Sequence, residues 1–153
     1  MRWLRKYLAL SPAGRAIVLR SLLLLPVVAA LLRARGMERT RAWLDRLGRR
    51  VRGDTSTLVP REIATLVGAA AFLVRARCLS RSLVLWHFLR DRNARAEVRL
   101  GVAKLEDGSL CAHAWVEFDG LPLNDGPGVR ERYAVLPSRA RGFRAGLPRT
   151  ISA

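Results

Sequence analysis

The fold is decided by residues 78–125, which read CLSRSLVLWHFLRDRNARAEVRLGVAKLEDGSLCAHAWVEFDGLPLND. In the first part of this stretch, apolar residues recur at the spacing of one helix face, at Leu79, Leu83, Trp86 and Leu89. We therefore expect a helix over residues 79–90, with Cys78 at or beside its N-terminus. After Asn93 the pattern changes to the alternation typical of a β-strand, so helix and sheet meet inside this segment.

The alternating part predicts an antiparallel meander. Strands are expected at residues 97–102 and 110–118, joined by a turn at residues 106–109. A second tight turn at Asp119-Gly120 leads to a short third segment, residues 121–125. Residues 132–136 are a candidate for one further strand, before an Arg/Pro/Gly tail that we expect to be loosely held.

Two helices are predicted near the N-terminus. Ser11-Pro12 combines a serine N-cap with a proline at the first helical position, and the apolar pattern after it continues to residue 34. Gly36 is expected to end this helix. A second helix is expected over residues 38–50, which carry Trp43, Leu44 and Leu47 at helical spacing.

A third helix opens at Val59-Pro60 and is expected to end close to Arg77. The loop before it divides the chain into an N-terminal helical segment, residues 1–56, and a core domain, residues 57–153. Helices followed by an antiparallel meander make an α+β fold.

Length and composition limit the function. The 153 residues and 17.1 kDa fit one domain, or one core with a small appendage, and exclude a multidomain machine. Half of the residues are hydrophobic, which excludes a disordered tail. The net charge of +16 comes almost wholly from arginine, because only two of 28 basic residues are lysines. Such a charge attracts acidic partners. Codon bias in a GC-rich genome is the alternative explanation, because it favours arginine over lysine on any protein surface. We expect no nucleic-acid partner, since the charge is scattered and no nucleic-acid-binding motif is present.

Compartment and membrane association follow from the cysteines and the most apolar stretch. Cys78 and Cys111 follow no secretory signal, so we expect reduced thiols in the cytoplasm. Residues 17–32 are apolar but are interrupted by Arg20 and Pro26. We interpret them as a buried or partner-facing helix, with a membrane-surface role as the alternative.

Three residues carry the chemical signal: Cys78 at a helix start, His113 in a strand and Asp125 after the following turn. A thiol attacks a carbonyl only as the thiolate, which a helix N-terminus and a nearby imidazole both stabilise. The imidazole then protonates the leaving amine, and a third group fixes its tautomer and orientation. A buried cysteine is ordinarily an inert hydrophobe, so the pattern predicts a Cys-His-Asp hydrolase only when the three residues are taken together. No metal is expected.

The alternation of side chains along the strands does not decide which residue orients His113. His113 and Trp115 share one face of the strand, so Trp115 is expected to shield the ion pair or to line the substrate cleft. A strict two-residue turn pairs Trp115 with Asn124 and puts Asp125 on the opposite face from His113. One extra loop residue, which Pro122 makes plausible, brings Asp125 beside the ring instead. Asp125 and Asn124 therefore remain rivals.

Two other residues are weaker candidates for the chemistry. Cys111 lies in mid-strand, where no helix terminus lowers the pKa of its thiol. His87 lies more than two turns beyond Cys78 in the same predicted helix and is expected to be structural.

Several motifs together resemble the transglutaminase-like core of the lasso-peptide maturation B proteins. They are CLSRSL at 78–83, GV at 101–102, HAWVE at 113–117, DG at 119–120 and ND at 124–125, and the resemblance covers about residues 57–137. It implies a transglutaminase- or papain-like cysteine protease core, with helices packed on a small antiparallel sheet and an N-terminal helical extension. It also implies Cys78 as nucleophile, His113 as base and acid, and Asp125 as orienter. Trp115 and Asn124 are our candidates for substrate binding.

The resemblance further implies a leader peptidase, which cleaves a ribosomally made precursor before a separate ATP-dependent cyclase closes a macrolactam. Residues 1–56 are helical and lack a strand signal, which resembles the split form of the family, in which a separate small protein recognises the leader. The precursor, that small protein and the cyclase are therefore the expected partners. No cofactor is expected, and no phosphate loop of the G-x-x-x-x-G-K-[ST] type is present. Amide transfer through the same thioester and a non-enzymatic leader-binding adaptor are the alternatives.

Overall fold

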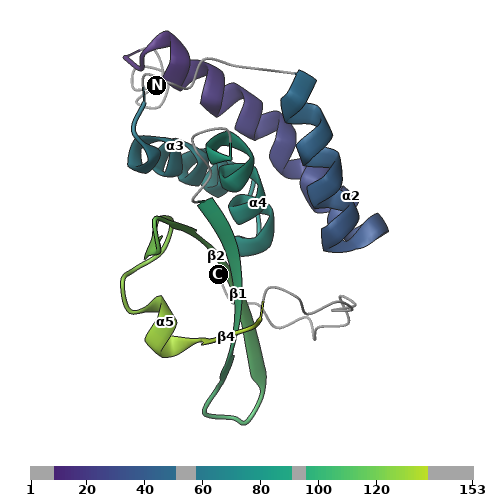
Figure 1. Ribbon diagram of the computed structural model, residues 1–153, viewed down its shortest axis with the longest axis vertical. Coiled ribbons are helices and arrows are strands. Elements are labelled where there is room, and N and C mark those ends of the chain that lie inside the picture. Colours follow the sequence, from purple (N-terminus) through teal and green to yellow (C-terminus); the bar gives the residue numbers. More distant parts are fainter. Residues whose placement is uncertain (1–8, 51–57, 91–95, 138–153) are drawn as a thin grey trace.

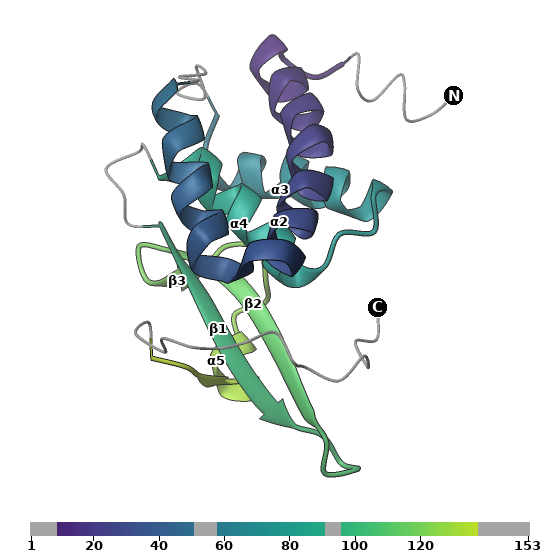
Figure 2. The same ribbon diagram turned by 90° about the vertical axis from the view of Figure 1, so that its right-hand side faces the viewer.

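A layer of helices packs against one part of a four-stranded antiparallel sheet, from which the tip of a long hairpin projects (Figures 1 and 2). The computed structural model describes residues 9–50, 58–90 and 96–137. The helices are α2 (Pro12–Arg50), α3 (Pro60–Leu73), α4 (Cys78–Leu89) and the short α5 (Val129–Arg132). The strands are β1 (Ala96–Lys104), β2 (Leu110–Phe118), β3 (Leu121–Pro122) and β4 (Ala134–Val135), in the spatial order β3-β2-β1-β4. The α+β prediction is confirmed.

Helix α2 is two helical arms joined at Gly36. The backbone at Gly36 is non-helical, with φ 76° and ψ 179°, a conformation that glycine adopts without steric cost. The Thr40 hydroxyl donates to the Gly36 carbonyl at 2.7 Å and fixes the start of the second arm. The two arms run in opposite directions, as Figure 2 shows, so the predicted break at Gly36 is confirmed.

Helix α3 ends one turn earlier than the sequence predicts. Its last helical residue is Leu73, not a residue close to Arg77. Arg75 takes a left-handed conformation (φ 49°), and the Ala76 N–H donates back to the Ala71 carbonyl at 2.9 Å. This is the Schellman ending of a helix, in which glycine ordinarily occupies the left-handed position. Because arginine stands there instead, the sequence carried no stop signal.

The β1–β2 hairpin has the expected position but longer strands. Strand β2 has the predicted bounds, whereas β1 extends beyond residues 97–102 at both ends. In the register, Gly101 lies opposite His113. The third and fourth strands are shorter than predicted: β3 stops at Pro122, and β4 covers two residues because Arg132 belongs to α5.

All three long helices contribute to one hydrophobic core with the sheet. The core contains Leu25 and Leu44 of α2, Val67 of α3, Leu85 of α4 and Val116 of β2. The second arm of α2 is also held by Arg90, which follows α4 and donates to the Asp45 carboxylate at 2.9 Å. The loop proposed to separate residues 1–56 from 57–153 lies outside the described residues, and that division stays a prediction.

Within the described part of the chain, the stretch Pro12–Gly48 has the length and composition of a membrane-crossing helix. Its most apolar 18 residues have a mean hydropathy of 2.1, and 28% of them are buried. Helices buried in a protein core pass the same test. Leu25 lies in the core, whereas Leu19, Leu23 and Val27 form an exposed row at helical spacing.

Candidate active site

Cys78 is the first residue of α4, where the polypeptide enters the helix from the loop after α3. Its thiol interacts with the His113 ring of β2 and with the backbone of Ala114. The first intrahelical bond of α4 is donated by the Arg81 N–H to the Arg77 carbonyl, 3.0 Å away. The N–H groups before it, at Cys78 and Leu79, therefore stand at the positive end of the helix dipole.

His113 links Cys78 to Asp125. Its Nε2 atom lies 2.5 Å from Oδ2 of Asp125, which leaves Nδ1 as the ring nitrogen for the thiol. The side chains of His113 and Asp125 are 20% and 23% exposed, so water reaches the pair only in part. The Gly126 N–H donates to the other carboxylate oxygen of Asp125 at 2.8 Å and holds the carboxylate in place.

The environment shifts the thiol and the imidazole toward the charged pair. Burial raises the pKa of Cys78, but its hydrogen bond and charge interaction with His113, with hydrogen bonds from the backbone, lower that pKa below its ordinary value. The hydrogen bond with Cys78 raises the pKa of His113 most; burial opposes this, and Asp125 raises it further. Both shifts widen the pH range in which thiolate and imidazolium coexist.

Asn124 supports the sheet instead of the ring. The Leu123 N–H donates to the Val116 carbonyl at 2.8 Å, but the Val116 N–H donates to the Asn124 side-chain oxygen at 2.7 Å. The side chain thus replaces the main-chain acceptor at this point of the ladder. The turn is the strict two-residue type, with Phe118 opposite Leu121. Because the main-chain ladder ends with the Leu123 N–H, strand parity no longer governs Asp125, which turns toward His113.

The helix supplies two supporting residues that sequence reasoning did not single out. The buried Ser82 hydroxyl donates to the Ala114 carbonyl at 3.0 Å and accepts from the Asn124 amide at 3.3 Å. Arg81 donates to the Asn124 carbonyl at 3.0 Å. Both residues lie three and four positions after Cys78, on the same helix face. This spacing from Cys78 could have identified them in the sequence, because residues on this face of α4 pack against β2.

Two aromatic rings pack against the imidazole and lie close to each other, with 6.3 Å between their centroids. The rings of Tyr133 and Trp115 are stacked with that of His113, with centroids 5.0 and 6.1 Å away. Trp115 is fully buried, and neither it nor Asn124 lines the cleft described below. The structure thus places Trp115 beside the His113 ring and Asn124 against the sheet and α4, and their role in substrate binding stays a prediction. Tyr133 was missed because it follows α5, an element that the sequence did not predict.

Gly101 makes room for this ring packing. A Cβ atom there would lie 2.7 Å from the Cβ of Tyr133 and 2.9 Å from the Trp115 ring. We expect Gly101→Ala to displace these rings and with them His113, lowering stability by about 1–3 kcal/mol, as overpacking does. Cleavage should slow at least tenfold, since small misplacements of a reacting group have effects on that order. Urea unfolding and initial cleavage rates check both.

A matched control for this prediction is Gly68→Ala in α3. A Cβ atom at Gly68 meets nothing within 4 Å. Alanine in a helix interior is favoured over glycine by about 1 kcal/mol, so this variant should be more stable and equally active. Equal behaviour of the two variants would contradict the packing role of Gly101.

Glu117 is a buried carboxylate that ties the aromatic rings to α5. It is 2% exposed and accepts from the Trp115 indole at 3.1 Å, from Arg99 at 3.0 Å and from Arg130 at 2.6 Å. The hydrogen bonds from Arg130 lower the pKa of Glu117 most, and the result is a pKa of about 2. This ion cluster fixes Trp115 behind His113 and holds α5, which leads to Tyr133.

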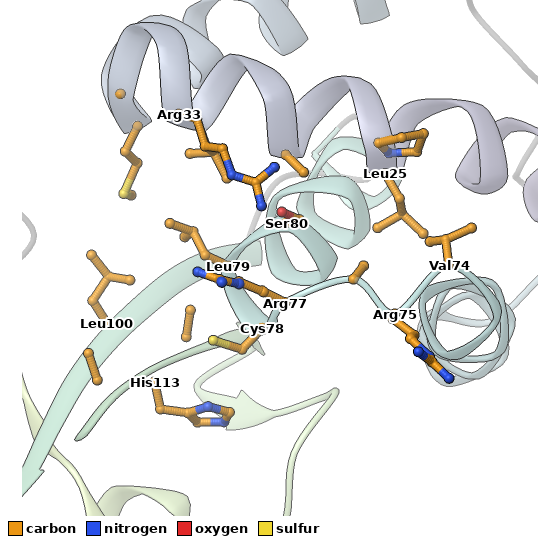
Figure 3. A pocket seen from close by; sticks show the side chains of 18 of the residues that line it. Leu25, Arg33, Val74, Arg75, Arg77, Cys78, Leu79, Ser80, Leu100 and His113 are labelled. Carbon is orange, nitrogen blue, oxygen red and sulfur yellow. The ribbon is translucent and has the colours of Figure 1, made fainter. Parts of the chain in front are cut away.

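A cleft of about 510 Å³ opens beside the thiol (Figure 3). Cys78 and His113 lie at its wall on the side of the sheet, and α2 forms the opposite wall. The loop between α3 and α4, residues 74–77, closes a third side. A molecule bound in this cleft would therefore lie beside the Cys78 side chain.

The other candidates do not take part in this arrangement. Neither Cys111 nor His87 lines the cleft. The His87 ring meets that of Phe88 edge-on, with centroids 5.6 Å apart. Within residues 9–50, 58–90 and 96–137, no three His, Cys, Asp or Glu side chains gather in a way that would hold a metal ion.

The geometry suits nucleophilic attack by sulfur on a carbonyl group. A thiol with a lowered pKa, an imidazole held by a carboxylate and the N–H groups of a helix start lie together at one cleft wall. The same parts serve hydrolysis and acyl transfer, because the two reactions differ only in whether water or an amine attacks the thioester.

Comparison with known proteins identifies the family of this chain. Residues 16–138 match the family model described as the transglutaminase-like superfamily. Over 64 residues the chain is 31% identical to the microcin J25-processing protein McjB of Escherichia coli; the match covers 42% of this chain and 29% of that protein. No solved structure matches the chain. Because the family match runs from α2 through β4 and takes in most of the chain, this protein belongs to the transglutaminase-like superfamily.

Proposed function

We propose that this protein is a cysteine peptidase that removes the leader peptide from a ribosomally synthesised lasso-peptide precursor, before a separate cyclase forms the macrolactam. The observation that carries the proposal is the contact of the Cys78 thiol with His113, whose other ring nitrogen meets Asp125, at the wall of an open cleft. Membership of the transglutaminase-like superfamily and the match to a microcin J25-processing protein support it.

The reaction divides into two steps at Cys78. In the first, the Sγ thiolate attacks the scissile carbonyl, the C–N bond breaks, and the His113 imidazolium gives its proton to the leaving amine. The core peptide leaves with a free N-terminus, while the leader stays as a thioester. In the second, His113 takes a proton from water as it attacks the thioester, and the leader leaves with a free carboxylate. Asp125 keeps the ring oriented and stabilises the imidazolium throughout.

The N-terminus of α4 stabilises the intermediate. Negative charge develops on the carbonyl oxygen in each step, beside the carbon that the sulfur attacks. The N–H groups of Cys78 and Leu79 precede the first intrahelical bond and lie next to the sulfur, so they are suited to receive this charge. The helix dipole favours the same charge.

Asp125 and Asn124 should behave differently when mutated. Asp125→Asn keeps the shape but removes the charge beside His113, so we expect cleavage to fall by about a hundredfold or more with stability nearly unchanged. Asn124→Ala leaves the Val116 N–H without its acceptor and should lower stability by about 1–3 kcal/mol with a smaller effect on cleavage. Steady-state kinetics and urea unfolding of both variants check this. The reverse ranking in kinetics would give the orienting role to Asn124.

Product analysis distinguishes this proposal from its alternatives. A lasso precursor incubated with the protein and its partner should give a leader that ends in a free carboxylate, as measured by mass. A leader joined to an amine would instead indicate acyl transfer through the same thioester. An uncleaved precursor and a Cys78 that reacts no faster than a free thiol would indicate a leader-binding adaptor.

The proposed setting of the reaction is the cytoplasm. The expected partners are the precursor peptide, a separate small leader-recognition protein and the ATP-dependent cyclase that receives the new N-terminus. The exposed apolar row of α2, at Leu19, Leu23 and Val27, is the surface that we assign to the leader-recognition protein.

A further inference from the structure

The lining of the cleft beside Cys78 combines apolar side chains with two cationic ones. Leu32 and Met37 of α2 line the cleft with apolar side chains, and the fully buried Leu25 of the same helix borders it. Arg33 of the same helix and Arg77 of the loop before α4 add two cationic groups at the rim. Both arginines are exposed, and each also lines the cleft.

The Arg33 and Arg77 side chains line the same cleft. Figure 3 shows the Arg33 side chain reaching down from α2 toward that of Arg77, near Cys78. The third arginine of the rim, Arg75, points away to the far side. Among the described residues, no carboxylate forms an ion pair with Arg33 or Arg77. Two cations that share a partly enclosed space without a counter-ion favour the binding of an anion.

We propose that the cleft selects a peptide segment that carries a carboxylate side chain beside a bulky aliphatic one, close to the scissile bond. The carboxylate lies between Arg33 and Arg77, and the aliphatic side chain lies against the apolar wall of α2. Arg77 directly precedes Cys78 in the chain, so the acidic residue falls within a few residues of the bond that is cut. This inference rests on the proposed function, because it names the substrate of the same site.

The chemistry of the cleft favours a peptide over a small anion. A free phosphate would be held by the arginines alone and would leave the apolar wall of α2 exposed to water. A peptide with adjacent acidic and aliphatic side chains covers both surfaces and also brings a carbonyl group to the Cys78 sulfur.

A scan with reversible peptide ligands tests the proposal on the full chain. The probes are peptidyl α-ketoamides with three residues on each side of the electrophilic carbon, all alanine except for one leucine and one adjacent glutamate. The pair is moved through every position, and each probe has a partner with glutamine in place of glutamate. Binding is measured as protection of Cys78 from alkylation by iodoacetamide, followed at Cys78 by peptide mapping, so that Cys111 does not interfere.

We expect one position at which the glutamate probe protects Cys78 about tenfold better than its glutamine partner, the preference of one charge-assisted hydrogen bond. In Arg33→Gln or Arg77→Gln this ratio should fall several-fold, and in the double variant it should fall to about one. The ratio corrects for any change in thiol reactivity, because both probes meet the same thiol. Arg35→Gln is the matched control: Arg35 is exposed on the same helix but does not line the cleft, so the ratio should stay unchanged.

The alkylation data separate a failure of this inference from a failure of the proposed function. Fast alkylation of Cys78 without probe, combined with equal protection by glutamate and glutamine probes at every position, would overturn the inference and leave the peptidase proposal standing. Absence of protection by any probe would also overturn it. Alkylation of Cys78 no faster than that of free cysteine would count against the peptidase proposal itself.

Discussion

Cys78→Ala is expected to slow precursor cleavage by at least about a thousandfold and to leave the fold intact. The rate falls because the sulfur forms the thioester and no neighbouring group can replace it; loss of a nucleophile has effects on this order or larger. The fold is retained because the substitution removes one half-buried atom at the cleft wall and no core contact. Cleavage of a precursor peptide is measured by mass spectrometry, and stability by urea unfolding.

Cys111→Ala is the control for this variant. Cys111 is also half-buried and lies in the same sheet as His113, but it does not line the cleft. We expect it to retain cleavage within a few fold of the wild type. A Cys78→Ala protein that still cleaves, or a Cys111→Ala protein that does not, would show that the nucleophile has been assigned to the wrong thiol.

The largest loss of stability is expected from Glu117→Gln. The change leaves Arg99 and Arg130 without the carboxylate that both contact and weakens the hold on Trp115. Breaking a buried ion pair costs about 3–5 kcal/mol. Because the two arginine side chains are 30% and 49% exposed and regain water, we expect about 3 kcal/mol. Glu97→Gln is the control: Glu97 contacts Arg99 from an exposed position, where such pairs contribute less than about 1 kcal/mol.

The pH dependence of stability gives a second measurement on Glu117. Its pKa is about 2 in the folded protein and 4.5 ordinarily, so its contribution is fully present above pH 4.5 and is lost as the pH falls toward 2. The free energy of unfolding of the wild type should fall relative to Glu117→Gln over this range, by up to about 3 kcal/mol. If the difference in the free energy of unfolding between the two proteins stays constant from pH 6 to pH 2.5, the Glu117 carboxylate is not stabilised by the arginines.

Local sequence signals predicted the elements that local physics controls. Gly36 interrupts α2 because only glycine adopts its backbone conformation without steric strain. Strand β2 was predicted correctly because its residues alternate clearly between two turns. Arg75 ends α3 in a conformation that sequence statistics assign to glycine, so the end of that helix was placed one turn too late. The tertiary packing that stabilises this turn is not readable from neighbouring residues.

The position of Asp125 likewise depends on contacts that neighbouring residues in the sequence do not reveal. The parity argument assumed that the ladder continues past Leu123, and on that assumption Asp125 faces away from His113. The Asn124 side chain ends the ladder by accepting the Val116 N–H, and Asp125 is then free to turn toward the ring. This depends on Ser82 of α4, which contacts Asn124 from a distant part of the sequence. Only the family resemblance favoured Asp125 before the structure was known.

The central claim is that Cys78 is ionised by its contact with His113, and the pH dependence of its alkylation tests this most directly. Iodoacetamide labelling of Cys78, measured by peptide mapping beside free N-acetylcysteine, should reach half of its maximal rate at a lower pH than the free thiol, because His113 lowers the pKa of Cys78. In His113→Ala the midpoint should rise to that of the free thiol or above it, since burial remains and raises the pKa. A wild-type midpoint equal to or above that of N-acetylcysteine, and unchanged by His113→Ala, would contradict the account.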